Sequence, residues 1–329
     1  MEDYGARRQK AICWSMHRVC NMKIYTITLN PAYDVHAYAE HFMPFHENLA
    51  QILSKEAGGK GLNISRALIT SKVPNTAVIV LGADNGADYR QSLSAARVDC
   101  LLFEVDGRIR ENLTLHCADA PETRISFSGF RLDESILTKI QAALAVNNQT
   151  IITFTGRVPD GIGMNQVKAF LRQLQDQGAK IVLDSRSFTL KDMYDVQPWL
   201  IKPNQEEISA FFGCTVECIQ DAADKAKEIA RQGIPNVMIS MGQQGALLVA
   251  EGKTLHAVPP KVNVLSTIGA GDSSIAGFIA AAMQEKTSAE CLRSAVAFGT
   301  AACLTEGSQP PKSDDVNRIF RQIKIQEVS

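Results

Sequence analysis

A short glycine-rich segment, Gly269-Ala270-Gly271-Asp272, separates the β-prone residues 262–265 from an apolar run at 273–284 that predicts a helix. A helix that begins at such glycines leaves its first backbone N–H groups uncovered, and their partial positive charge suits a phosphate group. Asp272 beside this anion hole is a candidate base for a hydroxyl that attacks the phosphate. An acid in a first helical turn also stabilises the helix by itself, so residue type alone leaves both interpretations open.

A second glycine-rich segment lies nearer the N-terminus, at Gly58-Gly59-Lys60-Gly61-Leu62-Asn63. It follows a strand-like run at 49–56 and opens a helical pattern at 64–70. Three glycines within four residues let a ligand approach the backbone closely, and Lys60 and Asn63 are the candidate contacts. The spacing matches neither a P-loop nor a dinucleotide-binding fingerprint, and by itself it also fits a tight strand-to-helix turn.

The elements that must position these two segments alternate between strand and helix patterns. Several runs are short and continuously apolar, as in strands that are buried on both faces of a sheet. The expected strands are 23–29, 77–81, 151–154, 180–183, 200–202, 237–240 and 246–249. Helical spacing lies between them, for example at Val167, Phe170, Leu171 and Leu174. This alternation predicts an α/β fold with a mostly parallel central sheet and helices on both faces.

Two regions, at about 33–56 and 100–130, show strand-like alternation without a helix between the strands. We expect them to form a small antiparallel sheet beside the main core. Over an active site, such a sheet would act as a lid that excludes water. There is no repeat, low-complexity tract or linker, so residues 22–329 are predicted to form one domain with the lid inserted into it.

Composition excludes several classes of protein. The formal net charge of −1 provides no global field that would attract nucleic acid or an anionic membrane. The longest apolar stretch, at 275–283, is too short to span a bilayer. Eight scattered cysteines without a Cys-x-x-Cys pair are typical of free thiols in a reducing compartment. We therefore expect a cytoplasmic protein.

The first 21 residues are basic and contain only a short apolar patch at 11–14. A secretory signal needs a longer apolar core and a small-residue cleavage site, which this segment lacks. We expect a disordered extension, and Met22 is a candidate for the natural start because the first strand pattern follows it directly.

The two glycine segments together resemble the two signatures of the PfkB (ribokinase-like) family of carbohydrate kinases. The opening Thr28-Leu29-Asn30-Pro31-Ala32-Tyr33-Asp34 is similar to that of its 1-phosphofructokinase and tagatose-6-phosphate kinase branch. Further matching segments are Arg110-Glu111-Asn112-Leu113, Ser126-Phe127-Ser128-Gly129-Phe130, Lys202-Pro203-Asn204-x-x-Glu207 and Ser240-x-Gly242-x-x-Gly245. They follow the family's order from about residue 22 onward. The resemblance implies a three-layer α/β/α core with a small β-sheet lid.

The resemblance also implies a role for each matching position. Asp272 would be the general base, and the backbone of Gly269, Ala270 and Gly271 would hold the charge of the transferred phosphoryl group. The substrate would contact Asp34, Gly59, Lys60, Asn63, Arg110, Asn112 and Arg157. ATP would contact Lys202, Asn204, Ser240, Gly242, Gly245, Gly269 and Gly271. Asn204 and Glu207 would help to hold Mg²⁺ through water, and Arg110 would pair with a phosphate already on the sugar.

Two departures from the branch bear on the substrate. Arg157 stands in Thr155-Gly156-Arg157-Val158-Pro159, where the branch usually has serine, and it follows an apolar strand pattern. A charge in that position favours an anionic ligand over a structural ion pair. Thr114 stands where 1-phosphofructokinases tend to have lysine. These changes affect the identity of the sugar more than the reaction.

The sequence therefore predicts ATP-dependent phosphorylation of a ketohexose phosphate, such as fructose 1-phosphate or tagatose 6-phosphate. The alternatives are a kinase of an unphosphorylated sugar or of a nucleoside, and a weakly active regulatory protein that binds nucleotide or sugar. Arg110 and Arg157 would lack an anion in the first alternative, and a pure binder has no use for the base Asp272. A homodimer through the lid is a further hypothesis, because a small two-faced sheet otherwise exposes apolar side chains and edges.

Overall fold

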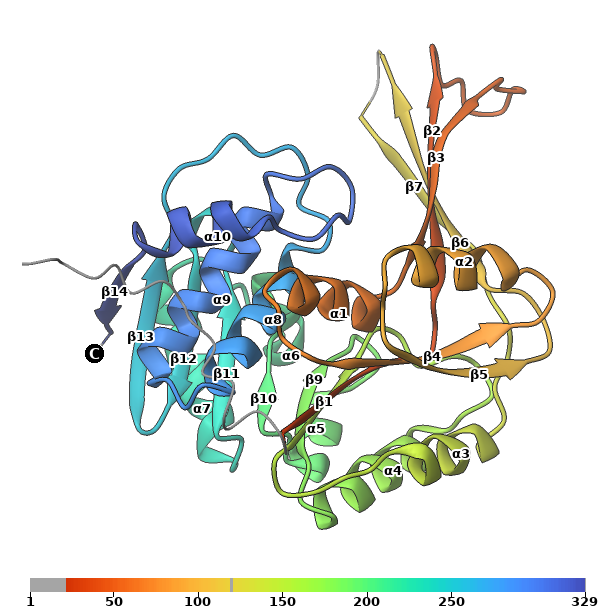
Figure 1. Ribbon diagram of the computed structural model, residues 1–329. Helices are drawn as coiled ribbons and strands as arrows, with labels where there is room; N and C mark the ends of the chain where they lie inside the picture. The colour runs from red at the N-terminus through yellow and green to blue at the C-terminus, as the bar shows by residue number, and fades with distance from the viewer. Residues whose placement is uncertain (1–21, 119–120, 329) are drawn as a thin grey trace, which may run out of the picture.

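The computed structural model describes residues 22–118 and 121–328, so the extension predicted for 1–21 lies outside the described residues. Within them, ten strands form one large sheet in the order β14-β13-β12-β11-β10-β9-β8-β1-β4-β5 (Figure 1). Their bounds are β1 Lys23–Thr28, β4 Thr76–Gly82, β5 Cys100–Val105, β8 Thr150–Thr155, β9 Lys180–Asp184, β10 Leu200–Ile201, β11 Asn236–Ser240, β12 Ala246–Ala250, β13 Lys253–Val258 and β14 Lys324–Glu327. The pairings from β5 through β11 are parallel, and those from β11 to β14 are antiparallel.

Helices cover both faces of this sheet, as the alternating pattern predicted. They are α1 Lys60–Thr70, α2 Ala87–Ala95, α3 Ser135–Ala143, α4 Met164–Asp176, α5 Leu190–Val196, α6 Gln205–Phe212, α7 Ile219–Arg231, α8 Ala270–Ala282, α9 Ser288–Ala302 and α10 Ser313–Phe320. Helices α1, α8, α9 and α10 pack into one core cluster, and α3, α4, α6 and α7 contribute to a second (Figure 1). The protein is thus a three-layer α/β/α structure.

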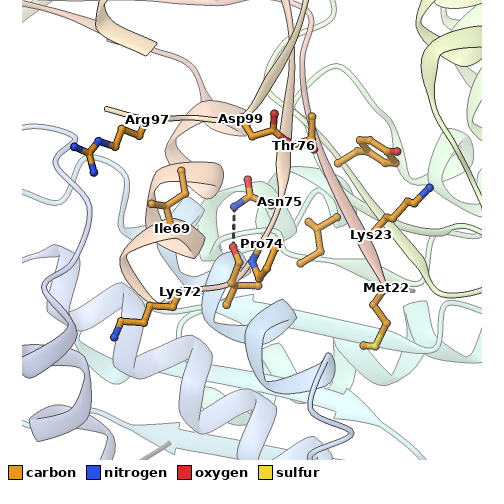
Figure 2. A pocket seen from close by; sticks show the side chains of 12 residues that line it. Met22, Lys23, Ile69, Lys72, Pro74, Asn75, Thr76, Arg97 and Asp99 are labelled. Carbon is orange, nitrogen blue, oxygen red and sulfur yellow. Dashed lines mark hydrogen bonds between the residues drawn. The ribbon is translucent and has the colours of Figure 1, made fainter. Parts of the chain in front are cut away.

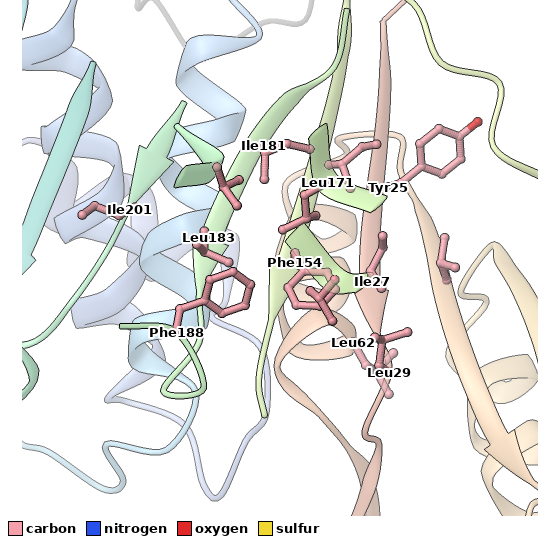
Figure 3. Packing of buried hydrophobic residues seen from close by; sticks show 14 of the residues in the cluster. Tyr25, Ile27, Leu29, Leu62, Phe154, Leu171, Ile181, Leu183, Phe188 and Ile201 are labelled. Carbon is pink, nitrogen blue, oxygen red and sulfur yellow. The ribbon is translucent and has the colours of Figure 1, made fainter. Parts of the chain in front are cut away.

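The central strands are buried because each carries apolar side chains on both faces. Figure 3 shows side chains of β1, β8 and β9 meeting between the layers. Phe154 on β8 packs edge-on against Phe188 with ring centroids 6.0 Å apart. On α4, the residues predicted from helical spacing are the buried ones. Burial of each such side chain contributes roughly 1.5–3 kcal/mol.

A second sheet of four strands forms the lid and extends away from the main core (Figure 1). Its order is β3-β2-β6-β7, with bounds β2 Ala32–Ala39, β3 Gln51–Gly58, β6 Arg110–Cys117 and β7 Thr123–Ser126. The sheet is mixed rather than purely antiparallel, because β2 and β6 pair in parallel along eight residues. Helix α2 packs beside the junction, where the Tyr89 hydroxyl donates to the carbonyl of Gly58 at 2.6 Å.

Two expectations need correction. The lid strands predicted within 100–130 are only β6 and β7, because β5 pairs in parallel with β4 at the edge of the main sheet. The β-prone residues 262–265 do not form a strand, and the chain reaches α8 through an irregular segment. Their side chains suit a strand, but they have no partner strand there. Among the described residues, no helix has both the length and the apolar content that a bilayer crossing requires.

Candidate active site

The predicted site residues converge where the sheet order reverses. From β1 the chain proceeds to β4 and β5 on one side, and through β8, β9 and β10 on the other. Ligands of open α/β sheets bind beyond the carboxyl ends of the strands at such a switch point. Asp184 ends β9, Lys202 directly follows β10, and Lys60 and Asp272 lie in the first turns of α1 and α8.

A hydrogen bond joins the two glycine segments. The Asn63 side chain donates through Nδ2 to Oδ2 of Asp272 at 2.9 Å, across 209 residues of sequence. The turns before both helices need glycine, because Gly59 has φ 136° and Gly269 has φ 76°. Helix α1 also lies close to β1, since a Cβ on Gly61 would come within 2.4 Å of Oγ1 of Thr28. Two segments that are distant in sequence therefore form one site.

Asp272 is the third residue of α8 and only 6% exposed. Burial raises its pKa to about 6 from 3.8, while Lys60 and Asn63 act in the opposite direction. A carboxyl with a pKa near neutrality suits general base catalysis, since it is ionised at pH 7 and still basic enough to take a proton. The start of α8 has no side-chain cap, so its first N–H groups are left for an anion.

Two lysines converge on a carboxylate beside Asp272. Oδ2 of Asp184 accepts a hydrogen bond from Nζ of Lys60 at 2.9 Å and lies 3.9 Å from Nζ of Lys202. Burial alone raises the pKa of Asp184, but Lys202 and Lys60 hold it below its ordinary value. The ammonium group of Lys60, a predicted sugar contact, thus pairs with Asp184 and is attracted by Asp272 at longer range. Sequence reasoning did not select Asp184, which the structure places beside the predicted site residues Lys60 and Lys202.

The lid contributes a hydrogen-bonded row of polar side chains. Arg110 donates through Nη1 to Oδ1 of Asn112 at 2.6 Å, and Asn112 donates through Nδ2 to Oδ1 of Asp34 at 2.9 Å. Asp34 also faces Gly58, where a Cβ would come within 2.2 Å of its Oδ2. Burial raises the pKa of Asp34, and Asn112 and Arg110 oppose that effect. The predicted sugar contacts on the lid therefore lie next to the first glycine segment.

Arg110 and Arg157 lie close enough to repel each other. Burial lowers the pKa of Arg110, Asp34 opposes this effect, and Arg157 adds to the lowering. The buried Nε of Arg110 has no hydrogen-bond partner, and in the described part of the chain neither guanidinium makes a salt bridge. Two neighbouring cations with unused donors are suited to an anion.

The residues predicted for the nucleotide side lie on neighbouring strand ends. Asn204 caps α6, where its Oδ1 accepts from the N–H of Glu207 at 2.8 Å, and it forms a bridge with Ser240 at the end of β11. Gly242 is the first residue of the short 3₁₀ turn that follows, Gly242–Gln244, and Gly245 comes directly after it. Glu207 also accepts a hydrogen bond from Nε of Arg186 at 2.8 Å.

A hollow of about 200 Å³ lies between the lid and the segment before α8. Asp34 and Asn112 line it together with residues that sequence reasoning did not select, among them Arg124 and Ser308. The Ser308 hydroxyl is buried without a partner. Another cavity, of about 530 Å³, lies where β1 and β4 begin and contains none of the predicted site residues (Figure 2). Of these two spaces, only the hollow beside the lid is lined by predicted site residues.

Comparisons with known proteins identify the family of the chain. Residues 26–315 match the pfkB family of carbohydrate kinases. The 1-phosphofructokinase of Vibrio cholerae is 31% identical over 92% of this chain and 96% of its own length, and that of Bacillus subtilis is 30% identical over 92% and 99%. The crystal structure of phosphofructokinase-2 from Escherichia coli in complex with potassium superposes with a TM-score of 0.84 at 28% identity, over 92% of this chain and 99% of that one. The chain belongs to the pfkB family of carbohydrate kinases.

Proposed function

We propose that the protein transfers the γ-phosphoryl group of MgATP to a hydroxyl of a sugar phosphate and so forms a bisphosphate. Ketohexose phosphates such as fructose 1-phosphate or tagatose 6-phosphate are the acceptors we favour. The observation that carries the proposal is a site with two unlike ends. Asp272 lies near Lys60 and Lys202 at one end, and the guanidinium groups of Arg110 and Arg157 lie at the other. A phosphate on the substrate supplies the anion that these guanidinium groups lack.

In the proposed mechanism Asp272 accepts the proton of the acceptor hydroxyl. The hydroxyl oxygen forms a bond to the γ-phosphorus as the bond from that phosphorus to the leaving oxygen of ADP breaks. Backbone N–H groups of Gly269, Ala270 and Gly271 face the charge on the transferred group at the start of α8. Asp34, Asn63 and Asn112 orient the sugar, so most of the catalysis comes from positioning and charge neutralisation.

The residues Asn204 and Glu207 fit a magnesium ion that arrives with the nucleotide. No group of three or more His, Cys, Asp or Glu side chains in the described residues is arranged to hold a metal on its own. Mg²⁺ in kinases keeps several waters and takes one or two carboxylates plus phosphate oxygens. Glu207 supplies such a carboxylate, and its partner Arg186 is exposed and free to move away. The bound ion would neutralise charge on the ATP phosphates.

An ADP-release assay across sugars, sugar phosphates and nucleosides tests this function. We expect turnover with one or more ketohexose phosphates and far less with the parent sugars, because only the phosphates satisfy Arg110 and Arg157. The Asp272→Asn variant serves as the control for contaminating ATPase. Faster turnover of an unphosphorylated sugar or a nucleoside would contradict the proposal, and no turnover of any acceptor would favour a binding protein.

We also propose a homodimer through the lid. Its face opposite His36 is apolar, and Ile52 and Ile125 there are 66% and 43% exposed. We expect Ile52→Lys to shift the protein toward monomer in sedimentation velocity, because it places a charge in the interface. Val258→Lys, an exposed position on β13, should leave the mass unchanged. A wild-type protein that is monomeric at all concentrations would refute the dimer.

The substrates and the thiols favour a cytoplasmic location. All six cysteines that the structure describes are free: Cys100, Cys117, Cys214, Cys218, Cys291 and Cys303. Free thiols persist in reducing compartments, where ATP and sugar phosphates are also present. Fractionation of the native host would test this location, and recovery outside the cytoplasm would contradict it.

A further inference from the structure

A hollow of about 790 Å³ lies at the end of the sheet opposite the candidate active site. Its lining includes the first residues of β9 and β11, Lys180 and Asn236, and Trp199, which directly precedes β10. These strands run in parallel, so the hollow lies at their amino ends. Lys180 and Asp184, at the two ends of β9, are roughly 13 Å apart along the strand. The hollow has the volume of a small-molecule site, and none of the predicted site residues lines it.

Basic side chains from several elements line this hollow and outnumber its acids. They are Lys180, Lys227, Arg231 and Lys286, against the single carboxylate of Glu251. Lys227 and Arg231 are four residues apart on α7, so they share one face of that helix. In the described part of the chain, Lys227 alone among the four makes a salt bridge, with Asp224 at 3.9 Å. The other three keep their donors for a ligand or for water.

Helix ends explain part of this arrangement but not all of it. A cation is favoured near the C-terminus of a helix, and Arg231 ends α7 while Lys286 follows the end of α8. Glu290 also attracts Lys286 at longer range. Neither effect accounts for Lys180 at the start of a strand, or for the apolar surface that lies among these charges.

The hollow has an apolar floor and a basic rim. Ile234, Val249 and Phe278 in its lining are buried, whereas Lys180, Arg231 and Lys286 are exposed. Buried apolar residues beneath exposed cations are suited to a ligand with an apolar part and a charged part.

Trp199 adds an aromatic surface to this floor. It is half-buried and packs edge-on against Phe278 of α8, with ring centroids 5.6 Å apart. Nζ of Lys180 lies over the Trp199 ring, 5.2 Å from its centroid. Asn236 donates to the backbone carbonyl of Trp199, and no hydrogen bond of the described residues uses the indole N–H. The indole therefore offers both an apolar surface and a donor to a ligand.

We propose that this hollow binds a small organic anion with a planar aromatic ring. The ring packs on Trp199, and the anionic group accepts charge-assisted hydrogen bonds from Arg231 and Lys286. A guanidinium group matches the oxygens of a phosphate or of a carboxylate, so either group fits. The site is separate from the proposed phosphoryl transfer and does not depend on it.

The fluorescent dye anilinonaphthalene sulfonate is the probe, because it combines aromatic rings with an anionic group. The protein has two tryptophans, so in a Trp14→Phe background Trp199 is the only indole that can transfer energy to the dye. We expect dye emission on excitation of Trp199. In this background, Arg231→Glu and Lys286→Glu should each raise the dissociation constant of the dye about 10-fold or more, since each replaces a charged donor by a repelling carboxylate.

Arg321→Glu is the matched control. Like Arg231→Glu, it reverses an exposed arginine at the C-terminal end of a helix, but Arg321 follows α10, which does not line the hollow. The control should keep the dissociation constant of the background protein. Unchanged dye binding in both hollow variants, or equal weakening in the control, would overturn the site.

Competition with the dye identifies the source of the anion. Adenosine monophosphate and benzoate both carry a planar ring and an anionic group, and the stronger competitor shows whether the natural ligand is a phosphate or a carboxylate. Adenosine alone and inorganic phosphate alone should displace the dye far less well, because each has only one of the two parts. Displacement by adenosine as strong as that by its monophosphate, or no displacement by either anion, would refute the proposal.

Discussion

An Asp272→Asn variant is expected to bind MgATP normally and to lose about 10²- to 10⁴-fold in kcat, the usual contribution of a positioned general base. The amide has the same size as the carboxylate and its oxygen still accepts the hydrogen bond from Asn63. The amide of the variant cannot take the proton of the acceptor hydroxyl. Steady-state kinetics together with calorimetry of nucleotide binding separate the two effects. Near-normal turnover would refute the base assignment for Asp272.

The same variant should be more stable than the wild-type protein above pH 7. Because burial raises the pKa of Asp272 to about 6, the folded protein binds this proton more tightly than the unfolded chain. The ionised carboxylate therefore opposes folding at high pH, by about 1–3 kcal/mol, and this cost declines as the pH falls below 6 toward 4. We expect a higher Tm for Asp272→Asn at pH 8 and little difference at pH 4. A Tm difference independent of pH would contradict the raised pKa.

Arg110→Ala and Arg157→Ala should each raise KM for the sugar phosphate about 10- to 100-fold, with little change in KM for ATP. Hydrogen bonds to charged groups contribute roughly 1.5–3 kcal/mol, and each 1.4 kcal/mol is a factor of ten. Neither guanidinium makes a salt bridge in the described residues, and the carboxylate that Arg110 attracts at longer range, Asp34, is itself a proposed sugar contact. The loss should therefore appear in substrate binding alone.

Arg318→Ala is the control for these two variants, because it removes a surface guanidinium that pairs only with Asp315 on α10. It should leave both KM values unchanged. With an unphosphorylated sugar as a poor acceptor, the Arg110 and Arg157 variants should match the wild-type protein. Equal changes in KM for ATP and for sugar phosphate would show that these residues do not bind the substrate phosphate.

Short apolar runs predicted the central strands well, because strands buried on both faces leave little choice of side chain. The run at 151–154 became the core of β8. The same signal failed at 262–265, since β-propensity does not reveal whether a partner strand is present. It also left β5 ambiguous: alternation in 100–105 fits the lid or the edge of the main sheet, and only pairing with β4 decides.

The candidate site also has a part that local sequence predicted and a part that it did not. Residues within the two glycine segments were predicted from local spacing, and the structure brings Asn63 and Asp272 together. Asp184 was missed as a site residue because an isolated acid after a strand is common and usually solvated. Its importance depends on its two lysine neighbours. Lys60 lies 124 residues away in the sequence, and Lys202 follows β10, the strand beside β9. Such a cluster is visible only after folding.

The hydrogen bond from Asn63 to Asp272 has a consequence for how this protein can change over generations. Its two ends lie on α1 and α8, which pack directly on each other in one core cluster. A substitution that shifts either helix displaces the partner of the base, even when every residue that contacts substrate is kept. Tolerated changes in one glycine segment should therefore be accompanied by compensating changes in the other.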